Sequence, residues 1–148
     1  MSTTSMSLGR IASQPLSVRT VLAAVIGAGA NVAVLLAVQS AGIAPDFRAL
    51  AIPTVAFLSV VGAVGAAAVY AYLARRGEDA TRRFQRIAVA VLVVSFVPDV
   101  ALLFVDEAAT VAAVLALMIM HVVVAAVCLV TIPSDANEAP EDPTATSA

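Results

Sequence analysis

Long apolar runs separated by short polar stretches dominate the chain. Spanning a hydrocarbon core about 30 Å thick takes about 20 apolar residues in a helix. Four runs reach that length, at about residues 21–41, 49–73, 87–105 and 108–132. They do not alternate apolar and polar positions with a period of two, as strands of a transmembrane barrel would, and helices are the other structure that satisfies its own backbone in lipid. The pattern therefore predicts an all-α, polytopic membrane protein with four transmembrane helices.

The short connections and small residues predict how these helices pair. Only Asp106 and Glu107 separate the third run from the fourth, so these two helices are expected to form an antiparallel hairpin. The first two helices carry small residues four positions apart, a spacing that favours close packing in lipid: Ala23 with Gly27, and Gly62 with Ala66. We expect two helical hairpins that form one four-helix bundle over residues 18–133.

Composition agrees with a membrane location. Hydrophobic residues make up 61% of the chain and charged residues 12%, whereas soluble domains are about half apolar and about a quarter charged. Residues 1–17 are rich in Ser and Thr, and residues 134–148 are acidic and lack large apolar side chains. Both ends are expected to be disordered because they have too little apolar surface to form a core. The single cysteine, Cys128, excludes an intrachain disulfide.

The arginines predict an orientation. Two of the eight cationic residues precede the first run and one lies between the first and second runs. The others form a predicted basic loop between the second and third runs: Arg75, Arg76, Arg82, Arg83 and Arg86. Cytoplasmic loops carry an excess of Lys and Arg, so this loop and both termini are expected in the cytoplasm. Topology and anionic lipid headgroups explain the basic loop, and we expect no nucleic-acid partner.

An acidic residue stands within the third run. Asp99 follows Pro98 in the stretch VVSFVPDVALLF, and charged residues at such depths usually face a bundle interior or an aqueous cavity. At 1.5 Å per residue, Asp99 lies about 10 Å from the outer end, Asn31 about 15 Å and His121 about 20 Å. Asn31 is therefore expected to bridge the other two, since a direct contact would need a kink or a tilt. Ser95, one turn before Asp99, is expected on the same helix face.

These residues define a candidate intramembrane polar node: Asn31, Ser95, Pro98, Asp99 and His121. Ser59 and Thr54 of the second helix lie at similar depths and could join it. In a structural interpretation, Asp99 is protonated and the node holds the helices in register. In a functional interpretation, Asp99 and His121 exchange protons or bind a small ligand. Soft side chains at Met118, His121 and Cys128 suggest a third possibility, a membrane redox or metal-binding protein, but their pattern is no metal signature, and we expect neither metal nor cofactor.

Three of these features carry a resemblance: Asn31 in the first helix, SFVP at residues 95–98 and MH at residues 120–121. Over about residues 18–133, the chain resembles a family of small four-helix bacterial and archaeal membrane proteins known as a domain of unknown function. The resemblance implies the same fold and a prokaryotic plasma (inner) membrane location, and it implies no reaction. In that family the position after the proline is not usually acidic, which counts against Asp99 as a proton relay.

The sequence thus predicts an integral membrane protein without an assigned biochemical role. No phosphate-binding loop, nucleophile elbow, zinc-protease motif or paired-cysteine motif is present in the sequence, so an enzyme is not expected. A binding, accessory or structural membrane module is favoured, with the lipid bilayer and a second copy or a membrane protein as partners. The alternative is a small proton-coupled carrier that uses Asp99, with or without His121.

Overall fold

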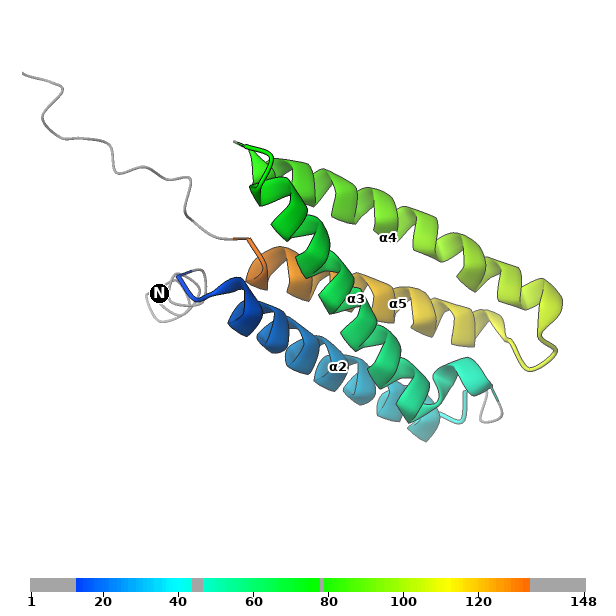
Figure 1. Cartoon of the computed structure of the whole chain (residues 1–148). Helices are drawn as coiled ribbons and strands as arrows, with labels where there is room; N and C mark the ends of the chain where they lie inside the picture. Colours follow the sequence, from blue (N-terminus) through cyan, green and yellow to red (C-terminus); the bar gives the residue numbers. More distant parts are fainter. Residues whose placement is uncertain (1–12, 44–46, 78, 134–148) are drawn as a thin grey trace, which may run out of the picture.

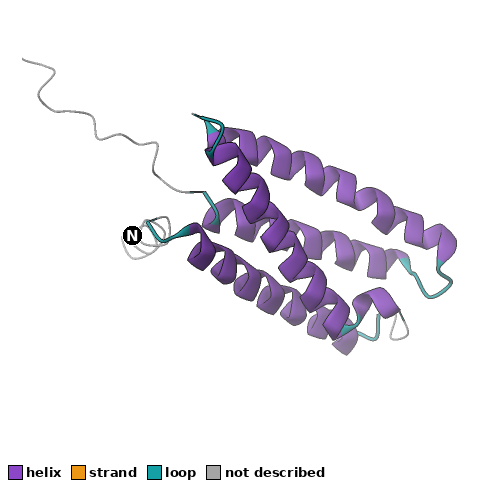
Figure 2. Ribbon diagram, viewed as in Figure 1, coloured by secondary structure: helices purple, strands orange, loops and turns teal. Residues whose placement is uncertain are grey.

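The computed structural model describes residues 13–43, 47–77 and 79–133. Within these residues the chain forms four α-helices, a short 3-10 helix and no strand (Figure 2). In chain order the elements are α2 (Leu16–Ser40), η1 (Arg48–Leu50), α3 (Ile52–Ala74), α4 (Ala80–Val105) and α5 (Val111–Thr131). All four α-helices are long and apolar enough to cross a membrane. The predicted all-α bundle of four transmembrane helices is confirmed.

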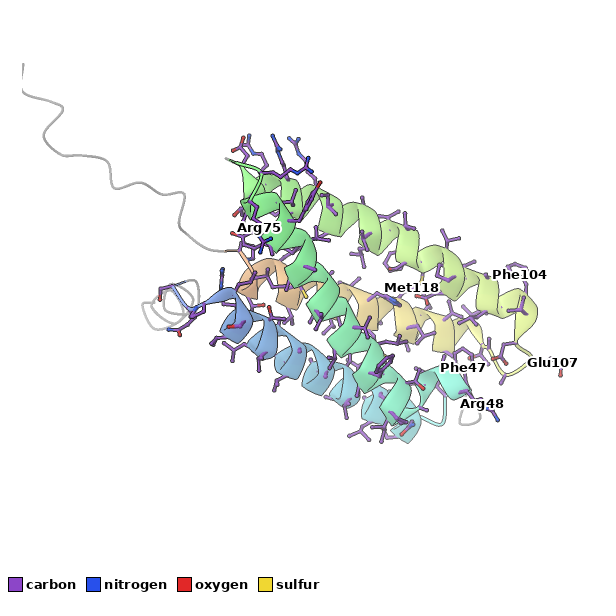
Figure 3. The ribbon with its side chains drawn as sticks, in the orientation of Figure 1. Phe47, Arg48, Arg75, Phe104, Glu107 and Met118 are labelled. Carbon is purple, nitrogen blue, oxygen red and sulfur yellow. The ribbon has the colours of Figure 1, made fainter. Side chains whose placement is uncertain are left out.

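The helices form two antiparallel hairpins, α2 with α3 and α4 with α5 (Figure 1). The start of α2, the turn between α3 and α4, and the end of α5 lie at one end of the bundle. The η1 segment and the connection between α4 and α5 lie at the other end. In Figure 3, Arg75 marks the first end, and Arg48 and Glu107 mark the second.

Helix α2 begins earlier than the apolar run predicted. The run was expected to begin at residue 21 and the bundle at residue 18. Leu16 and Ser17, which were expected to belong to a disordered segment over residues 1–17, are helical. Pro15 precedes the helix in an extended conformation, with ψ at 147°. Proline suits the start of a helix because no amide proton is required there, and it disfavours the helical conformation at the residue before it. The predicted disorder of residues 1–12 and 134–148 lies outside the described residues.

Helix α4 also begins early, at Ala80 instead of residue 87. Arg82, Arg83 and Arg86 are therefore helical, which corrects the prediction that they belong to a loop. The chain reverses just before them, at Gly77, whose φ of 123° strongly favours glycine. At 26 residues, α4 is about 39 Å long and exceeds a hydrocarbon core of about 30 Å. Arginine interrupts an apolar run but is a good helix former. A search for apolar runs therefore missed the first turns of α4.

The connection between α4 and α5 is longer than the two acidic residues suggested. It spans residues 106–110, since α5 begins at Val111. The Asp106 Oδ1 atom accepts a hydrogen bond from the Ala108 amide at 2.9 Å. The Thr110 hydroxyl oxygen accepts one from the Ala113 amide at 3.2 Å and caps the start of α5. A capping threonine satisfies an otherwise unpaired amide, which is why the helix starts after Thr110.

Close packing is concentrated among α2, α3 and α5. Ala23 of α2 and Ala63 of α3 are almost completely buried in one apolar cluster, in agreement with the close α2–α3 pair predicted from small residues. The glycines act differently from that prediction. A Cβ atom at Gly27 would lie 3.8 Å from Val124 of α5, and one at Gly62 only 3.3 Å from it. Gly62 therefore makes room for the Val124 side chain, whereas a Cβ atom at Gly27 would be in ordinary van der Waals contact with it.

Helix α4 is attached more loosely than the other three helices. It buries only Ala80, Phe84 and Asp99 among its described residues. Helix α4 runs beside α5. Helix α3 diverges from α4 beyond the turn that joins these two helices (Figure 1). Near that turn, Phe84 is 1% exposed and belongs to the same apolar cluster as Ala23 and Ala63. The outer face of α4 is left open to the surroundings of the bundle.

Candidate functional site

Asp99 and His121 meet directly between α4 and α5. The His121 Nδ1 atom lies 3.1 Å from the Asp99 Oδ2 atom, and the two side chains are 41% and 8% exposed. The same nitrogen lies 2.9 Å from the Leu117 carbonyl oxygen, one turn earlier on α5. The orientation favours the carbonyl, and Asp99 Oδ2 is left without a hydrogen-bond partner. The contact needs no bridging group, in contrast to the bridge by Asn31 expected from depth.

Asn31 belongs to a different cluster, which joins α2, α3 and α5. Its Nδ2 atom donates to the Ser59 hydroxyl oxygen at 2.9 Å and to the Met120 carbonyl oxygen at 3.3 Å. The Ser59 hydroxyl in turn donates to the Val55 carbonyl at 2.7 Å. The structure thus joins Asn31 to Ser59, one of the two α3 residues considered. Thr54 is not among the partners of Asn31.

Ser95 and Pro98 complete the set of predicted site residues. The Ser95 hydroxyl donates to the Leu92 carbonyl at 2.7 Å, and so it serves its own helix instead of Asp99. Pro98 lies inside α4, which remains helical on both sides of it. The predicted node is therefore divided into an Asp99–His121 contact, an Asn31–Ser59 cluster and a separate Ser95. The first two groups lie close together on α5, because Asn31 contacts the carbonyl of Met120 and the next residue is His121.

A large apolar groove connects these groups, and we call it the α3–α4–α5 groove. It has a volume of about 520 Å³ and is lined mainly by aliphatic side chains of the three helices that name it. Val61 and Gly65 belong to its α3 wall, Val91 to its α4 wall and Val124 to α5. The lining residues whose side chains carry nitrogen or oxygen are Asn31, Ser59, Ser95 and His121. The sequence reasoning found these polar residues but did not predict the groove, because its shape depends on the divergence of α3 from α4.

The basic residues lie at the end of the bundle where α3 turns into α4. Those predicted to form the loop are exposed: Arg75, Arg76, Arg82, Arg83 and Arg86. The Arg76 guanidinium lies 4.6 Å from the centre of the Tyr72 ring, a distance that allows a cation–π interaction. None of these arginines lines the α3–α4–α5 groove as the structure describes it.

Arg19 is a buried residue whose role the sequence did not reveal. It lies in the first turns of α2 and is 5% exposed. Its guanidinium donates to the carbonyl of Ile132, just after α5, and lies 5.8 Å from the centre of the Tyr70 ring. A cation is favourable at the carboxyl end of a helix, so Arg19 fastens α2 to the end of α5. An arginine two residues before an apolar run was the available signal.

The soft side chains of α5 differ in their position relative to the α3–α4–α5 groove. In the described parts of the chain, no three His, Cys, Asp or Glu residues lie together as metal ligands. Cys128 is buried and lines the α3–α4–α5 groove, as does His121. Met118 does not belong to that lining; Figure 3 labels it on α5.

The fold and the groove define a small polytopic membrane protein with four transmembrane helices. Residues 11–138 match the model of a family of unknown function, DUF6069, and the chain belongs to that family. This confirms the resemblance drawn from the sequence. No curated protein and no solved structure is significantly similar to the chain.

Proposed function

We propose that the protein is a binding module in the membrane that takes up a hydrophobic, lipid-soluble ligand between its helices. The observation that carries this proposal is the α3–α4–α5 groove, with its volume of about 520 Å³ and its aliphatic lining. Ligand pockets in proteins measure about 300–1,000 Å³ and combine apolar walls with a few polar groups. The groove has both properties. The proposal assigns binding and no catalysis.

The two walls indicate how a ligand enters. Val61 on the α3 wall is 49% exposed, and Val91 on the α4 wall is 61% exposed. Both walls belong to helices that would be surrounded by hydrocarbon, so a ligand dissolved in the bilayer reaches the groove sideways without crossing water. The loose attachment of α4 makes it the wall that moves most easily during entry.

Tryptophan fluorescence can test the proposal because the chain has no tryptophan of its own. Val91→Trp places a reporter on the groove wall. Val25→Trp is its control, since Val25 of α2 is similarly exposed at 66% but does not line the groove. Bromododecane is titrated into lipid nanodiscs that hold each variant. We expect saturable quenching of the groove reporter and only weak, non-saturable quenching of the control.

A second pair of variants tests whether the groove itself is occupied. Gly65 lines the groove and Gly29 does not, and a Cβ atom at either would meet nothing within 4 Å. Gly65→Phe should fill the groove and abolish saturable quenching, whereas Gly29→Phe should leave it unchanged. Equal quenching of the two tryptophan reporters would overturn the proposal. If quenching is equal and a cysteine at Val91 cross-links two copies, the α4 wall is an oligomer contact instead.

The Asp99–His121 contact favours a second candidate, a proton-coupled carrier. A carboxyl and an imidazole 3.1 Å apart within the spans can hold and pass a proton, and intramembrane ionisable residues usually serve function. In liposomes that contain a pH-sensitive dye, bromododecane is added under a pH gradient. A change in internal pH that Asp99→Asn abolishes would favour the carrier. No ligand-dependent proton movement in the unmodified protein would favour the binding module.

We also propose an orientation in the plasma (inner) membrane of a prokaryote, with both termini and the Arg75–Arg86 segment in the cytoplasm. The positive-inside rule supports it, as does the position of the described helix ends and the α3–α4 turn at one end of the bundle (Figure 1). In a Cys128→Ala background, a cysteine at Glu107 should react with an impermeant reagent from outside intact cells. A cysteine at Asp79 should react only after lysis, and the reverse result would contradict the orientation.

A further inference from the structure

The hydrogen bonds of Asn31 fix which way its amide points. Its two contacts are to the Met120 carbonyl and to the Ser59 hydroxyl oxygen. A carbonyl can only accept, and the Ser59 hydroxyl proton is already donated to Val55. Both groups therefore need an N–H donor, so the amide nitrogen faces them and Asn31 Oδ1 faces away. This oxygen is buried and has no hydrogen-bond partner.

The protons of the Ser95 hydroxyl and the His121 ring are also already used in hydrogen bonds. The Ser95 hydroxyl donates to the Leu92 carbonyl. The Nδ1 atom of His121 faces two acceptors, the Leu117 carbonyl and the Asp99 carboxyl group, so we assign the ring proton to Nδ1. In a neutral ring with that tautomer, Nε2 is an acceptor. With a neutral His121, the unused acceptors beside the groove are Asn31 Oδ1, which is buried, and His121 Nε2. The hydroxyl, amide and imidazole donors of the described lining are already used, and only the weak thiol donor of Cys128 remains.

The side-chain charges around the groove further restrict the class of ligand that it can bind. No Asp, Glu, Lys or Arg belongs to the groove lining in the described residues, and Asp99 lies buried beside it without lining it. A cationic ligand would therefore be desolvated in an apolar groove without a facing carboxylate, which is costly. A ligand that only accepts hydrogen bonds, such as an ether or a ketone, would meet acceptors. A neutral group that donates a hydrogen bond matches both constraints.

We infer that the groove selects a neutral, lipid-soluble alcohol, whose hydroxyl donates a hydrogen bond to Asn31 Oδ1 or His121 Nε2 while its apolar body fills the aliphatic walls. This inference rests on the proposed function, since it names the ligand class of the same groove. It differs from that proposal because a groove of this size could bind hydrophobic molecules without regard to a hydroxyl group.

Four probes of one chain length, titrated into the Val91→Trp protein, distinguish binding of any hydrophobic molecule from a preference for an alcohol. They are bromododecanol with its bromine at the chain end, the corresponding methyl ether, bromododecane, and bromododecyl trimethylammonium. One hydrogen bond in an apolar site should make the alcohol bind roughly three- to tenfold more tightly than the alkane. The ether should bind no better than the alkane, because it lacks the donor, and the ammonium probe should bind more weakly than the alcohol.

Variants then locate the acceptor. Asn31→Leu and His121→Phe each remove one acceptor, and at least one of them should make the alcohol bind only as tightly as the alkane. Alkane binding serves as the internal control for an intact groove. Thr20→Val removes a hydroxyl that lies outside the groove lining and should retain the preference. If a variant fails to fold, the comparison of alcohol, ether and alkane in the otherwise unmodified protein still decides the inference.

The possible outcomes distinguish failure of the alcohol inference from failure of the proposed function. Equal binding of alcohol, ether and alkane to the groove reporter would overturn the inference and leave the proposed binding module intact. Tighter binding of the ammonium probe than of the alcohol would overturn it in favour of a cation site at Asp99. Absence of saturable quenching by every probe would overturn the proposed function together with the inference.

Discussion

The α2–α3–α5 unit and helix α4 are stabilised in different ways. The unit buries small residues such as Ala23 and Ala63 almost completely and ties its helices through Asn31 and Arg19. Helix α4 buries few described residues, and its polar contact to α5 is between Asp99 and His121. Packing in membranes rests on close contact between helices because lipid tails are as apolar as the side chains. Three helices are therefore packed closely together, and α4 is attached to them through few buried residues.

The largest expected effect is on the packing of the unit. Ala63 is fully buried, so Ala63→Leu would force α2, α3 and α5 apart. We expect it to lower the free energy of unfolding by about 3 kcal/mol, the upper part of the usual range for overpacking. Ala88→Leu on α4 is the matched change, and its side chain would extend into the groove at little cost. Reversible unfolding in mixed detergent measures both, and equal losses would remove the distinction between the unit and α4.

The next effect concerns Arg19, which joins α2 to the end of α5. Arg19→Met keeps most of the apolar stem but leaves the Ile132 carbonyl without its donor. Removing one partner of a buried hydrogen bond costs about 1–3 kcal/mol. Arg76→Met is the control, because Arg76 is exposed at the same end of the bundle. The same unfolding measurement should show a clear loss for Arg19→Met and a smaller one for Arg76→Met.

A smaller effect is expected from the hydrogen bond between Asn31 and Ser59. Hydrogen bonds between membrane helices average about 0.6 kcal/mol. A double-mutant cycle with Asn31→Leu and Ser59→Ala should therefore give a coupling energy of that order. The cycle isolates this pair from the bond between Asn31 and Met120, which uses a main-chain atom. A coupling energy near zero would show that the contact does not hold α2 to α3.

The smallest effect is expected at α4. Asp99→Leu removes the contact with His121, but it also removes a buried carboxyl oxygen without a hydrogen-bond partner. Replacing a buried ionisable group by an apolar side chain of similar size is often neutral or stabilising. We expect the free energy of unfolding to change by less than about 0.5 kcal/mol, the range typical of sites that add little to stability. A loss as large as that of Ala63→Leu would show that Asp99 is a structural anchor.

Differences between the expected and observed helix ends show which local information was missing. The apolar run placed the start of α4 at residue 87, and the helix begins at Ala80 because its basic residues are compatible with a helix outside the hydrocarbon core. Thr110 shifted the start of α5 because a cap, and not the first apolar residue, decides where a helix begins. The basic residues of α4 and the capping Thr110 are both visible in the sequence, but a search for apolar runs does not detect them.

The contacts among the polar residues needed the tertiary structure. Depth along each helix suggested that Asn31 would lie between Asp99 and His121, yet these two meet directly and Asn31 contacts Ser59. Depth is one coordinate, and a contact also depends on the rotation of each helix about its axis and on the tilt between helices. In this bundle, Gly62 leaves room for Val124 of α5, a contact that exists only at the observed tilt and rotation of the two helices.

The sequence by itself determined the all-α class, four helices long and apolar enough to cross a membrane, and the family resemblance that the match over residues 11–138 confirms. These properties depend on the length and composition of each segment against the thickness of a bilayer, which is local information. The tertiary structure alone decided the division of the polar residues into separate contacts, the burial of Arg19 and the α3–α4–α5 groove. These depend on distances between helices, and such distances arise only when side chains from different segments pack together.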